Sequence, residues 1–186
     1  MAHFCLIRHG QTDWNLEGRY QGQSDVPLNE TGRSQAYELA RQLQDQTFAA
    51  SYSSDLKRAS ETAEIIATAI GISYSLDVRL REINQGEWEG QQVEVIKARY
   101  AGLWNRRMVD PASVRPPEGE TVGEVANRAA MAMDDLARLH PRARVLIVSH
   151  GLTLATIICQ VCGIPVGQAY TLIPGNSELI WVDWGK

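Results

Sequence analysis

The hydrophobic positions of this chain fall into short continuous runs, separated by longer stripes at helical spacing. The runs at residues 3–8, 49–53, 72–76, 145–148 and 178–182 have the length of β-strands. The first and fourth runs are apolar with little alternation, which is typical of strands that are buried on both faces. The pattern therefore predicts five strands, two of them in the interior of a sheet.

The segments between these runs carry signals of helix starts and ends. Asn29 is predicted as an N-cap, and Thr121 with Glu124 fits a capping box. Ser54 is placed to cap the helix that ends at Gly71. The apolar stripes of the three helices are Ala36, Leu39, Ala40 and Leu43; Leu56, Ala59, Ala63, Ile66 and Ile70; and Val125, Ala129, Met133 and Leu136.

Strands that alternate with helices predict an α/β fold with a largely parallel sheet. A further helix is expected near 91–99, and another follows the run at 145–148 and ends at Gly163. The polar segments 9–27 and 111–119 are expected to be loops, and the first is long enough to indicate a functional role. The sequence contains no internal repeat or linker, so residues 1–186 are expected to form one domain.

Composition narrows the class of protein. The chain has 186 residues, of which 44% are hydrophobic, enough for one compact domain with a full core. Its formal net charge is −4, which argues against a nucleic-acid partner because such proteins usually carry a basic surplus. No apolar run reaches the length of a membrane span, and no signal peptide is recognisable. We therefore expect neither a nucleic-acid nor a membrane partner.

The three cysteines, Cys5, Cys159 and Cys162, cannot form a disulfide framework. Their odd number and apolar surroundings predict reduced thiols and a cytoplasmic protein. Cys159 and Cys162 have the spacing of a redox pair, but they come near the end of a predicted helix. A redox pair usually sits at a helix N-terminus, so redox chemistry is not expected here.

Candidate chemistry appears where two of the predicted strands end. The first strand runs into His9-Gly10, and the fourth runs into His150-Gly151. Ligands of α/β sheets bind at the carboxyl ends of strands, so neighbouring strands would bring both imidazoles to one crevice. The glycines would let a phosphate approach the backbone closely. A neutral imidazole can attack phosphorus when a backbone carbonyl holds its other nitrogen in one tautomer.

A phosphoryl group also needs positive charge and a proton donor. Arg8 and Arg58 could each clamp phosphate oxygens through two hydrogen bonds, and His150 could donate a further one. The candidates that would complete the phosphate site are Asn15, Gln21 and Gly22, together with Gly151 beside the second histidine. Glu82 is the candidate that protonates the leaving oxygen and afterwards activates water.

Several blocks of sequence resemble the histidine phosphatase superfamily, which includes phosphoglycerate mutase. The first block is Leu6-Ile7-Arg8-His9-Gly10-Gln11-Thr12 with Trp14-Asn15. Further similar blocks are Gln21-Gly22 with Asp25, Pro27 and Leu28; Gly32 with Gln35-Ala36; Ser53-Ser54-Asp55-Leu56-Lys57-Arg58-Ala59 with Glu61-Thr62-Ala63; Leu80-Arg81-Glu82 with Gly86, Trp88, Glu89 and Gly90; and Ser149-His150-Gly151. They follow the order found in the family.

The resemblance implies a three-layer sandwich of the phosphoglycerate-mutase type, with a central sheet flanked by helices. It implies that His9 is the phosphorylated nucleophile, that Arg8, Arg58 and His150 bind phosphate, and that Glu82 is the proton donor. It also implies a reaction that needs neither a metal nor another cofactor. Spacing alone does not separate Glu82 from Glu87 or Glu89. Position 84 is Asn where relatives often have an acid, and we do not expect this change to abolish activity.

The length of the chain favours a phosphatase over a mutase. Phosphoglycerate mutases of this family are longer, with an inserted segment over the active site, whereas here residues 91–117 form only a small predicted cap. The mutases also tend to lack the Gly-Glu-Trp-Glu-Gly sequence found at 86–90. A small cap leaves a phosphohistidine open to water, so hydrolysis should predominate. Mutase-type transfer on the same site is the alternative, and a non-catalytic phospho-ligand-binding domain is a second one.

Other polar residues have ordinary interpretations. His3 and His140 are interpreted as strand and helix-end residues, and the scattered histidines make a zinc site improbable. Arg106 and Arg107 could line the substrate entrance or belong to a solvated surface. Residues Arg19, Tyr20 and Ser24 could contact substrate because they lie in the long loop. The expected partner is a small phosphomonoester. The sequence identifies neither that ester nor the oligomeric state.

Overall fold

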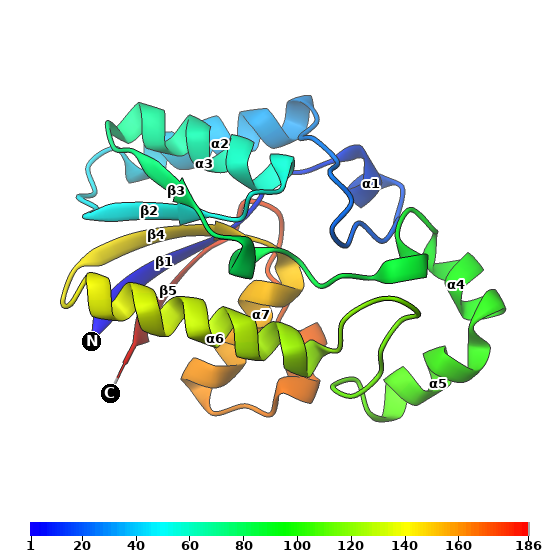
Figure 1. Ribbon diagram of the computed structural model, residues 1–186. Coiled ribbons are helices and arrows are strands. Elements are labelled where there is room, and N and C mark those ends of the chain that lie inside the picture. Colours follow the sequence, from blue (N-terminus) through cyan, green and yellow to red (C-terminus); the bar gives the residue numbers. More distant parts are fainter. Residues whose placement is uncertain (186) are drawn as a thin grey trace.

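The computed structural model describes residues 1–185, and their strands form one sheet in the order β3-β2-β4-β1-β5 (Figure 1). The strands are β1 (Ala2–Arg8), β2 (Ala50–Ser53), β3 (Tyr74–Leu76), β4 (Arg144–Ser149) and β5 (Leu179–Trp184). All neighbours are parallel except β5, which is antiparallel to β1. The predicted, mostly parallel α/β sheet is confirmed.

The two apolar strands lie side by side at the centre of the sheet. β1 and β4 pair in parallel, with Ile7 opposite Val148 and Arg8 opposite Ser149. Alternate side chains of β1 enter different cores: Phe4 packs on one side and Cys5 on the other. Burial on both faces explains why these two runs are continuously apolar.

Helices cover both faces of the sheet and make three layers (Figure 1). α2 (Glu30–Leu43) and α3 (Lys57–Ile70) pack on one face, and α6 (Val122–Leu139) and α7 (Gly151–Cys162) pack on the other. The expected caps are present: Asn29 Oδ1 accepts from Gly32 N at 2.9 Å, and Thr121 with Glu124 forms a capping box. The helices on the two faces of the sheet confirm the predicted three-layer sandwich.

The predicted cap of α3 is wrong. The N-cap residue is Leu56, and the helix begins at Lys57. Ser54 Oγ accepts only from Leu56 N, at 3.3 Å. The first helical amide, Lys57 N, donates instead to Asp25 Oδ1 at 2.8 Å, so a carboxylate from a distant loop takes the place of a local cap.

Two segments contain α-helices that the sequence pattern did not predict. α1 (Asp13–Leu16) lies inside the expected loop 9–27, where Thr12 and Asn15 form a capping box. After α4 (Val93–Arg99), close to the expected helix at 91–99, the chain forms α5 (Ala101–Val109). No residue of α5 is fully buried, so its sequence lacks the strong apolar stripe that would predict a helix.

α4 and α5 lie beyond the carboxyl ends of the parallel strands, at one side of the sheet (Figure 1). They fall inside the expected cap at 91–117. One-turn 3₁₀ helices connect the remaining elements at Val78–Leu80 and Gly86–Trp88, and a longer one spans Val166–Thr171. Among the helices described, none is long and apolar enough to cross a membrane.

Candidate active site

The two predicted histidines meet at the carboxyl ends of β1 and β4. His9 N donates to Ser149 O at 3.0 Å, which continues the pairing of the two strands. The ring centroids of His9 and His150 are 5.1 Å apart. The exposed fraction of the surface is 2% for His9 and 0% for His150. The neighbouring-strand prediction for the two imidazoles is therefore correct.

Hydrogen bonds define the tautomer of His9. Its Nδ1 lies 2.7 Å from Gly10 O, and because a carbonyl can only accept, Nδ1 carries the proton. Nε2 is then the atom with a lone pair, and it accepts a hydrogen bond from Arg58 Nε at 3.3 Å. Burial lowers the pKa of His9 well below its ordinary value, and the charges of Arg58 and Arg8 lower it further. The ring is therefore a neutral imidazole in one orientation, which is the form that can act as a nucleophile.

Arg58 is anchored by the loop that precedes α2. Its Nη1 and Nη2 donate to Ser24 O and Gly22 O at 2.8 and 2.7 Å, so the guanidinium is held in one orientation. Burial lowers the pKa of Arg58 to about 10, although nearby carboxylates including Glu82 act in the opposite direction. The side chain is buried yet cationic, and it contacts His9 Nε2.

Arg8 and His150 present polar atoms that the protein does not satisfy. Arg8 Nη1 donates to Pro174 O at 2.6 Å, but its buried Nε has no partner within residues 1–185. Both ring nitrogens of His150 are also buried without a partner in that range. Burial, together with the charge of Arg58, lowers the pKa of His150. Buried polar groups are nearly always paired, so these atoms indicate a polar ligand beside His9.

The two glycines that follow the histidines have steric roles. A Cβ on Gly10 would lie 2.4 Å from Gly32 O, so Gly10 lets α2 pack closely. A Cβ on Gly151 would lie 2.8 Å from Ile173 Cγ2 and 3.4 Å from Arg8 Cζ. Gly151 lines the pocket, and there it leaves room for the guanidinium of Arg8. Gly10 is outside the pocket lining, and its close neighbour is Gly32 of α2.

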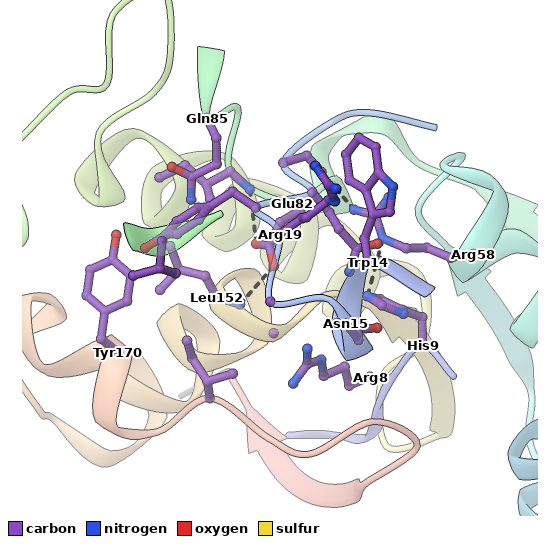
Figure 2. A pocket seen from close by; sticks show the side chains of 18 of the residues that line it. Arg8, His9, Trp14, Asn15, Arg19, Arg58, Glu82, Gln85, Leu152 and Tyr170 are labelled. Carbon is purple, nitrogen blue, oxygen red and sulfur yellow. Dashed lines mark hydrogen bonds between the residues drawn. The ribbon is translucent and has the colours of Figure 1, made fainter. Parts of the chain in front are cut away.

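Glu82 lies at the N-terminus of α7 and faces the pocket (Figure 2). Its carboxylate accepts from Leu152 N at 3.1 Å and from Thr153 N and Thr153 Oγ1 at 3.2 Å each. The structure separates the three glutamates that spacing could not. Glu87 is exposed and accepts from Tyr100 Oη, whereas Glu89 binds a neighbouring loop.

A pocket of about 380 Å³ joins these groups. It brings together eight of the nine predicted site residues: Arg8, His9, Asn15, Gln21, Gly22, Arg58, Glu82 and Gly151. The ninth, His150, lies behind the lining in ring contact with His9. Asn15 Oδ1 and Gln21 Oε1 both accept from Thr12, so the carbonyl ends of the two amides are committed within the loop.

The opposite wall of the pocket contains residues that sequence reasoning missed. Figure 2 shows Gln85 and Tyr170 across the pocket from Arg8 and His9. The further lining residues not predicted are Trp14, Gly18, Ile83, Val93, Leu152 and Ile173. Arg19 and Tyr20, named from their loop position, also line the pocket, but Ser24 does not. The missed residues come from four separate segments, which no local pattern brings together.

The Arg106-Arg107 pair divides into one pocket residue and one surface residue. Arg107 lines the pocket, donates to Tyr20 Oη at 2.7 Å and lies 4.2 Å from the ring centroid of Tyr170. Arg106 is exposed and lines a separate groove beside α5. The half-buried positions Leu103, Trp104 and Arg107 share helical spacing, which is the signal that could have separated the two arginines.

A zinc site and a redox cysteine pair are the other chemistries that the sequence made it necessary to consider. Within the described part of the chain, no three His, Cys, Asp or Glu side chains gather as a potential metal site. Cys5, Cys159 and Cys162 are free thiols, and burial raises the pKa of Cys5 to about 12. Cys159 and Cys162 lie at the C-terminal end of α7, as the sequence predicted.

Comparisons with known proteins find the same fold on similar sequences. The chain is 39% identical to the probable phosphoglycerate mutase GpmB of Erwinia tasmaniensis, over 98% of this chain and 85% of the relative. It is 33% identical to the solved structure of Bacillus stearothermophilus YhfR, with a TM-score of 0.91 over 98% and 91% of the two chains. A mycobacterial glucosyl-3-phosphoglycerate phosphatase, solved with VO3, is 31% identical, with a TM-score of 0.87 over 96% and 90%.

A family model covers nearly the whole chain. The model for the histidine phosphatase superfamily (branch 1) matches residues 4–186, a range that includes both histidines, both arginines and Glu82. The resemblance inferred from the sequence blocks is thereby confirmed. With its two histidines side by side on neighbouring strands, the chain belongs to branch 1 of the histidine phosphatase superfamily, a family of enzymes.

Proposed function

We propose that this enzyme hydrolyses a small organic phosphomonoester through a covalent phosphohistidine on His9. The observation that carries the proposal is the set of polar groups beside the His9 ring. Its lone pair faces Arg58 Nε, and the buried nitrogens of Arg8 and His150 have no protein partner within residues 1–185. Cationic or hydrogen-bonding groups around an oriented nucleophile are what an incoming phosphoryl group requires.

In the first step, His9 Nε2 attacks phosphorus while the bond from phosphorus to the ester oxygen breaks. Arg8, Arg58 and His150 stabilise the negative charge on the phosphoryl oxygens. Protonated Glu82 gives its proton to the departing oxygen, which leaves as an alcohol. The products of this half-reaction are phospho-His9, a free alcohol and an ionised Glu82.

In the second step, Glu82 takes a proton from water, and the oxygen of that water attacks the phosphorus of phospho-His9. The bond between nitrogen and phosphorus breaks, and inorganic phosphate leaves. His9 and protonated Glu82 are regenerated, so the cycle is balanced without a metal or another cofactor. The backbone amides of α7 keep the Glu82 carboxyl at one place through both steps.

The small cap supports hydrolysis over transfer. α4 and α5, at residues 93–109, are the helices of the expected cap, and water reaches a phosphohistidine most readily when little covers it. The mycobacterial neighbour named a phosphatase agrees with this proposal. Mutase-type transfer on the same site is the second candidate, because the Erwinia relative is named a probable phosphoglycerate mutase.

A third possibility, a non-catalytic phospho-ligand-binding domain, requires loss of the nucleophile or the acid, and His9 and Glu82 are both present. We keep a small phosphomonoester as the proposed partner and the cytoplasm as the proposed location. The free state of all three cysteines supports that location.

A rapid quench into an alkaline denaturant, with a ³²P-labelled phosphomonoester as substrate, tests the proposal. Denaturation during turnover should trap acid-labile, base-stable label on the protein, and free phosphate should accumulate. His9→Ala should abolish both. Label that moves to a second hydroxyl of an added acceptor would favour the mutase, and unchanged turnover by His9→Ala would refute the phosphohistidine mechanism. A panel of phosphomonoesters compared by kcat/KM then identifies the substrate.

A further inference from the structure

Glu89 is a carboxylate next to the site that the proposed mechanism does not use. It follows the 3₁₀ helix Gly86–Trp88 and is half-buried. Oε1 accepts from Gln23 N at 2.8 Å and from Gln85 N at 3.1 Å, and Oε2 accepts from Ser24 Oγ at 2.7 Å. The donors belong to two segments that are far apart in the sequence, so one carboxylate joins them.

The first of these segments holds Arg58. Gly22 O and Ser24 O are the two carbonyls that accept from its guanidinium, and Gln23 lies between them. Gly22 itself packs on the carboxylate: it has a φ of +51°, and a Cβ at this position would lie 2.1 Å from Glu89 Oε1. The position of Glu89 therefore determines where the carbonyls that orient Arg58 lie.

The second segment carries Glu82. Gln85, whose backbone N–H donates to Glu89, is three residues after Glu82, the proposed acid. Gln23 Nε2 also donates to Glu82 O at 3.1 Å, which joins the same two segments a second time. Movement of one segment relative to the other would change the separation between Arg58 and Glu82.

We infer that Glu89 is a positioning residue that fixes the phosphate-binding Arg58 relative to the proton donor Glu82. This inference rests on the proposed function. Glu89 lies outside the lining of the pocket, so it acts through the two segments rather than on the substrate. A carboxylate suits the place because its two oxygens can accept from three donors at once.

A purely electrostatic role is the competing explanation, because the charge of Glu89 also favours the cationic form of Arg58. Glu89→Gln distinguishes the two roles. Its carbonyl oxygen can accept from Gln23 N and Gln85 N, and its amide nitrogen can donate to Ser24 Oγ, so the geometry is kept while the charge is lost. If position matters, this variant should keep kcat/KM within about threefold of the wild type.

Glu89→Ala should lower kcat/KM by about 100-fold, because small displacements of catalytic groups have effects of that size. It should also weaken binding of orthovanadate, measured by calorimetry, by about tenfold or more. Exposed Glu87 provides the matched control, and Glu87→Ala should change neither quantity. Circular dichroism and thermal unfolding establish that each variant is folded.

The inference is wrong if folded Glu89→Ala keeps both kcat/KM and vanadate affinity within threefold, or if Glu89→Gln falls as far as Glu89→Ala. If Glu89→Ala does not fold, Ser24→Ala provides the test, because it removes one of the three donors to the Glu89 carboxylate. This variant should lower kcat/KM by about 3- to 10-fold, and an unchanged kcat/KM would overturn the inference. A wild type that binds orthovanadate without hydrolysing any ester would contradict the proposed function instead. The vanadate affinities of the variants would then still test the role of Glu89.

Discussion

The Nε–H of Arg58 donates to Nε2 of His9 across 3.3 Å, so the proposed phosphate-binding group contacts the lone pair of the proposed nucleophile. Nε2 cannot accept this hydrogen bond and form a bond to phosphorus at the same time. We therefore expect an incoming phosphoryl oxygen to take over the Arg58 Nε–H, which frees the lone pair of His9 for attack. The transfer of this one hydrogen bond from His9 to the substrate would then both bind the substrate and activate the nucleophile.

Arg58→Lys should separate charge from geometry at this position. One ammonium group cannot reach Gly22 O, Ser24 O and His9 Nε2 together, and each buried acceptor that it leaves unpaired costs about 1–3 kcal/mol. We expect the free energy of unfolding, measured in urea, to fall by about that amount, and kcat/KM to fall by about 100-fold or more.

Arg33→Lys is the matched control, because Arg33 forms an exposed ion pair with Glu61 at 2.6 Å. Its effect on stability should stay within about 0.5 kcal/mol. Wild-type kcat/KM in a folded Arg58→Lys protein would show that a point charge is enough, and that the planar arrangement around His9 is not needed.

The two buried histidines predict how stability depends on pH. The pKa of His9 and the pKa of His150 are both lowered in the folded state, chiefly by burial. Below about pH 6.5 the unfolded chain binds protons at these residues while the folded protein does not, which favours unfolding. Their contribution to stability is therefore complete above pH 6.5 and is lost as the pH falls below it, by at most about 1.4 kcal/mol per pH unit for each histidine.

Urea unfolding of the wild type, His9→Asn and His150→Asn between pH 5 and pH 7.5 measures this effect. Each single variant should have a shallower dependence of unfolding free energy on pH than the wild type. If both variants keep the wild-type slope, then these histidines do not remain neutral in the folded protein.

Gly86 should be intolerant of a side chain because two constraints coincide there. Its φ is +50°, and a Cβ would lie 1.9 Å from Pro117 O, a backbone atom that cannot move away cheaply. Gly71 has a φ of +74° but open space around it. Gly71→Ala should therefore cost about 1 kcal/mol through backbone strain alone, and Gly86→Ala clearly more. Equal losses in denaturant unfolding would show that the contact with Pro117 is relaxed without cost.

The sequence predicted the site best where function depends on consecutive residues. His9 and His150 each follow a continuous apolar strand, so the fold rule for α/β sheets predicts that they lie together. Helix starts with a side-chain cap, such as Asn29, were equally predictable from the sequence. In these cases the physical cause lies within a few residues of its effect.

Features that depend on distant partners were not predictable in this way. The start of α3 is satisfied by Asp25, 32 residues away, and so the local candidate Ser54 was the wrong cap. Glu82, Glu87 and Glu89 lie within eight residues of each other, and only their contacts with α7, Tyr100 and Ser24 distinguish them. Tertiary contacts therefore assigned roles that local pattern left open.

Arg107 and Arg106 provide a natural test of what the far wall of the pocket recognises. Arg107 donates to Tyr20 Oη and stacks near Tyr170, so its cationic guanidinium is presented to the pocket. We expect it to bind a second anionic group on substrates that carry one. Charged hydrogen bonds contribute about 1.5–3 kcal/mol, so Arg107→Met should raise KM for 3-phosphoglycerate by about 10- to 100-fold.

The comparison substrate is glycerol 3-phosphate, which has the same carbon skeleton but a hydroxymethyl group in place of the carboxylate, and its KM should change little in Arg107→Met. Arg106→Met removes an equal charge from the exposed neighbouring position and should leave KM for both esters unaltered. An equal rise in KM for the two esters in Arg107→Met would mean that the side chain shapes the pocket without reading charge. The same rise in Arg106→Met would instead point to a long-range effect of net charge, which added salt should then abolish.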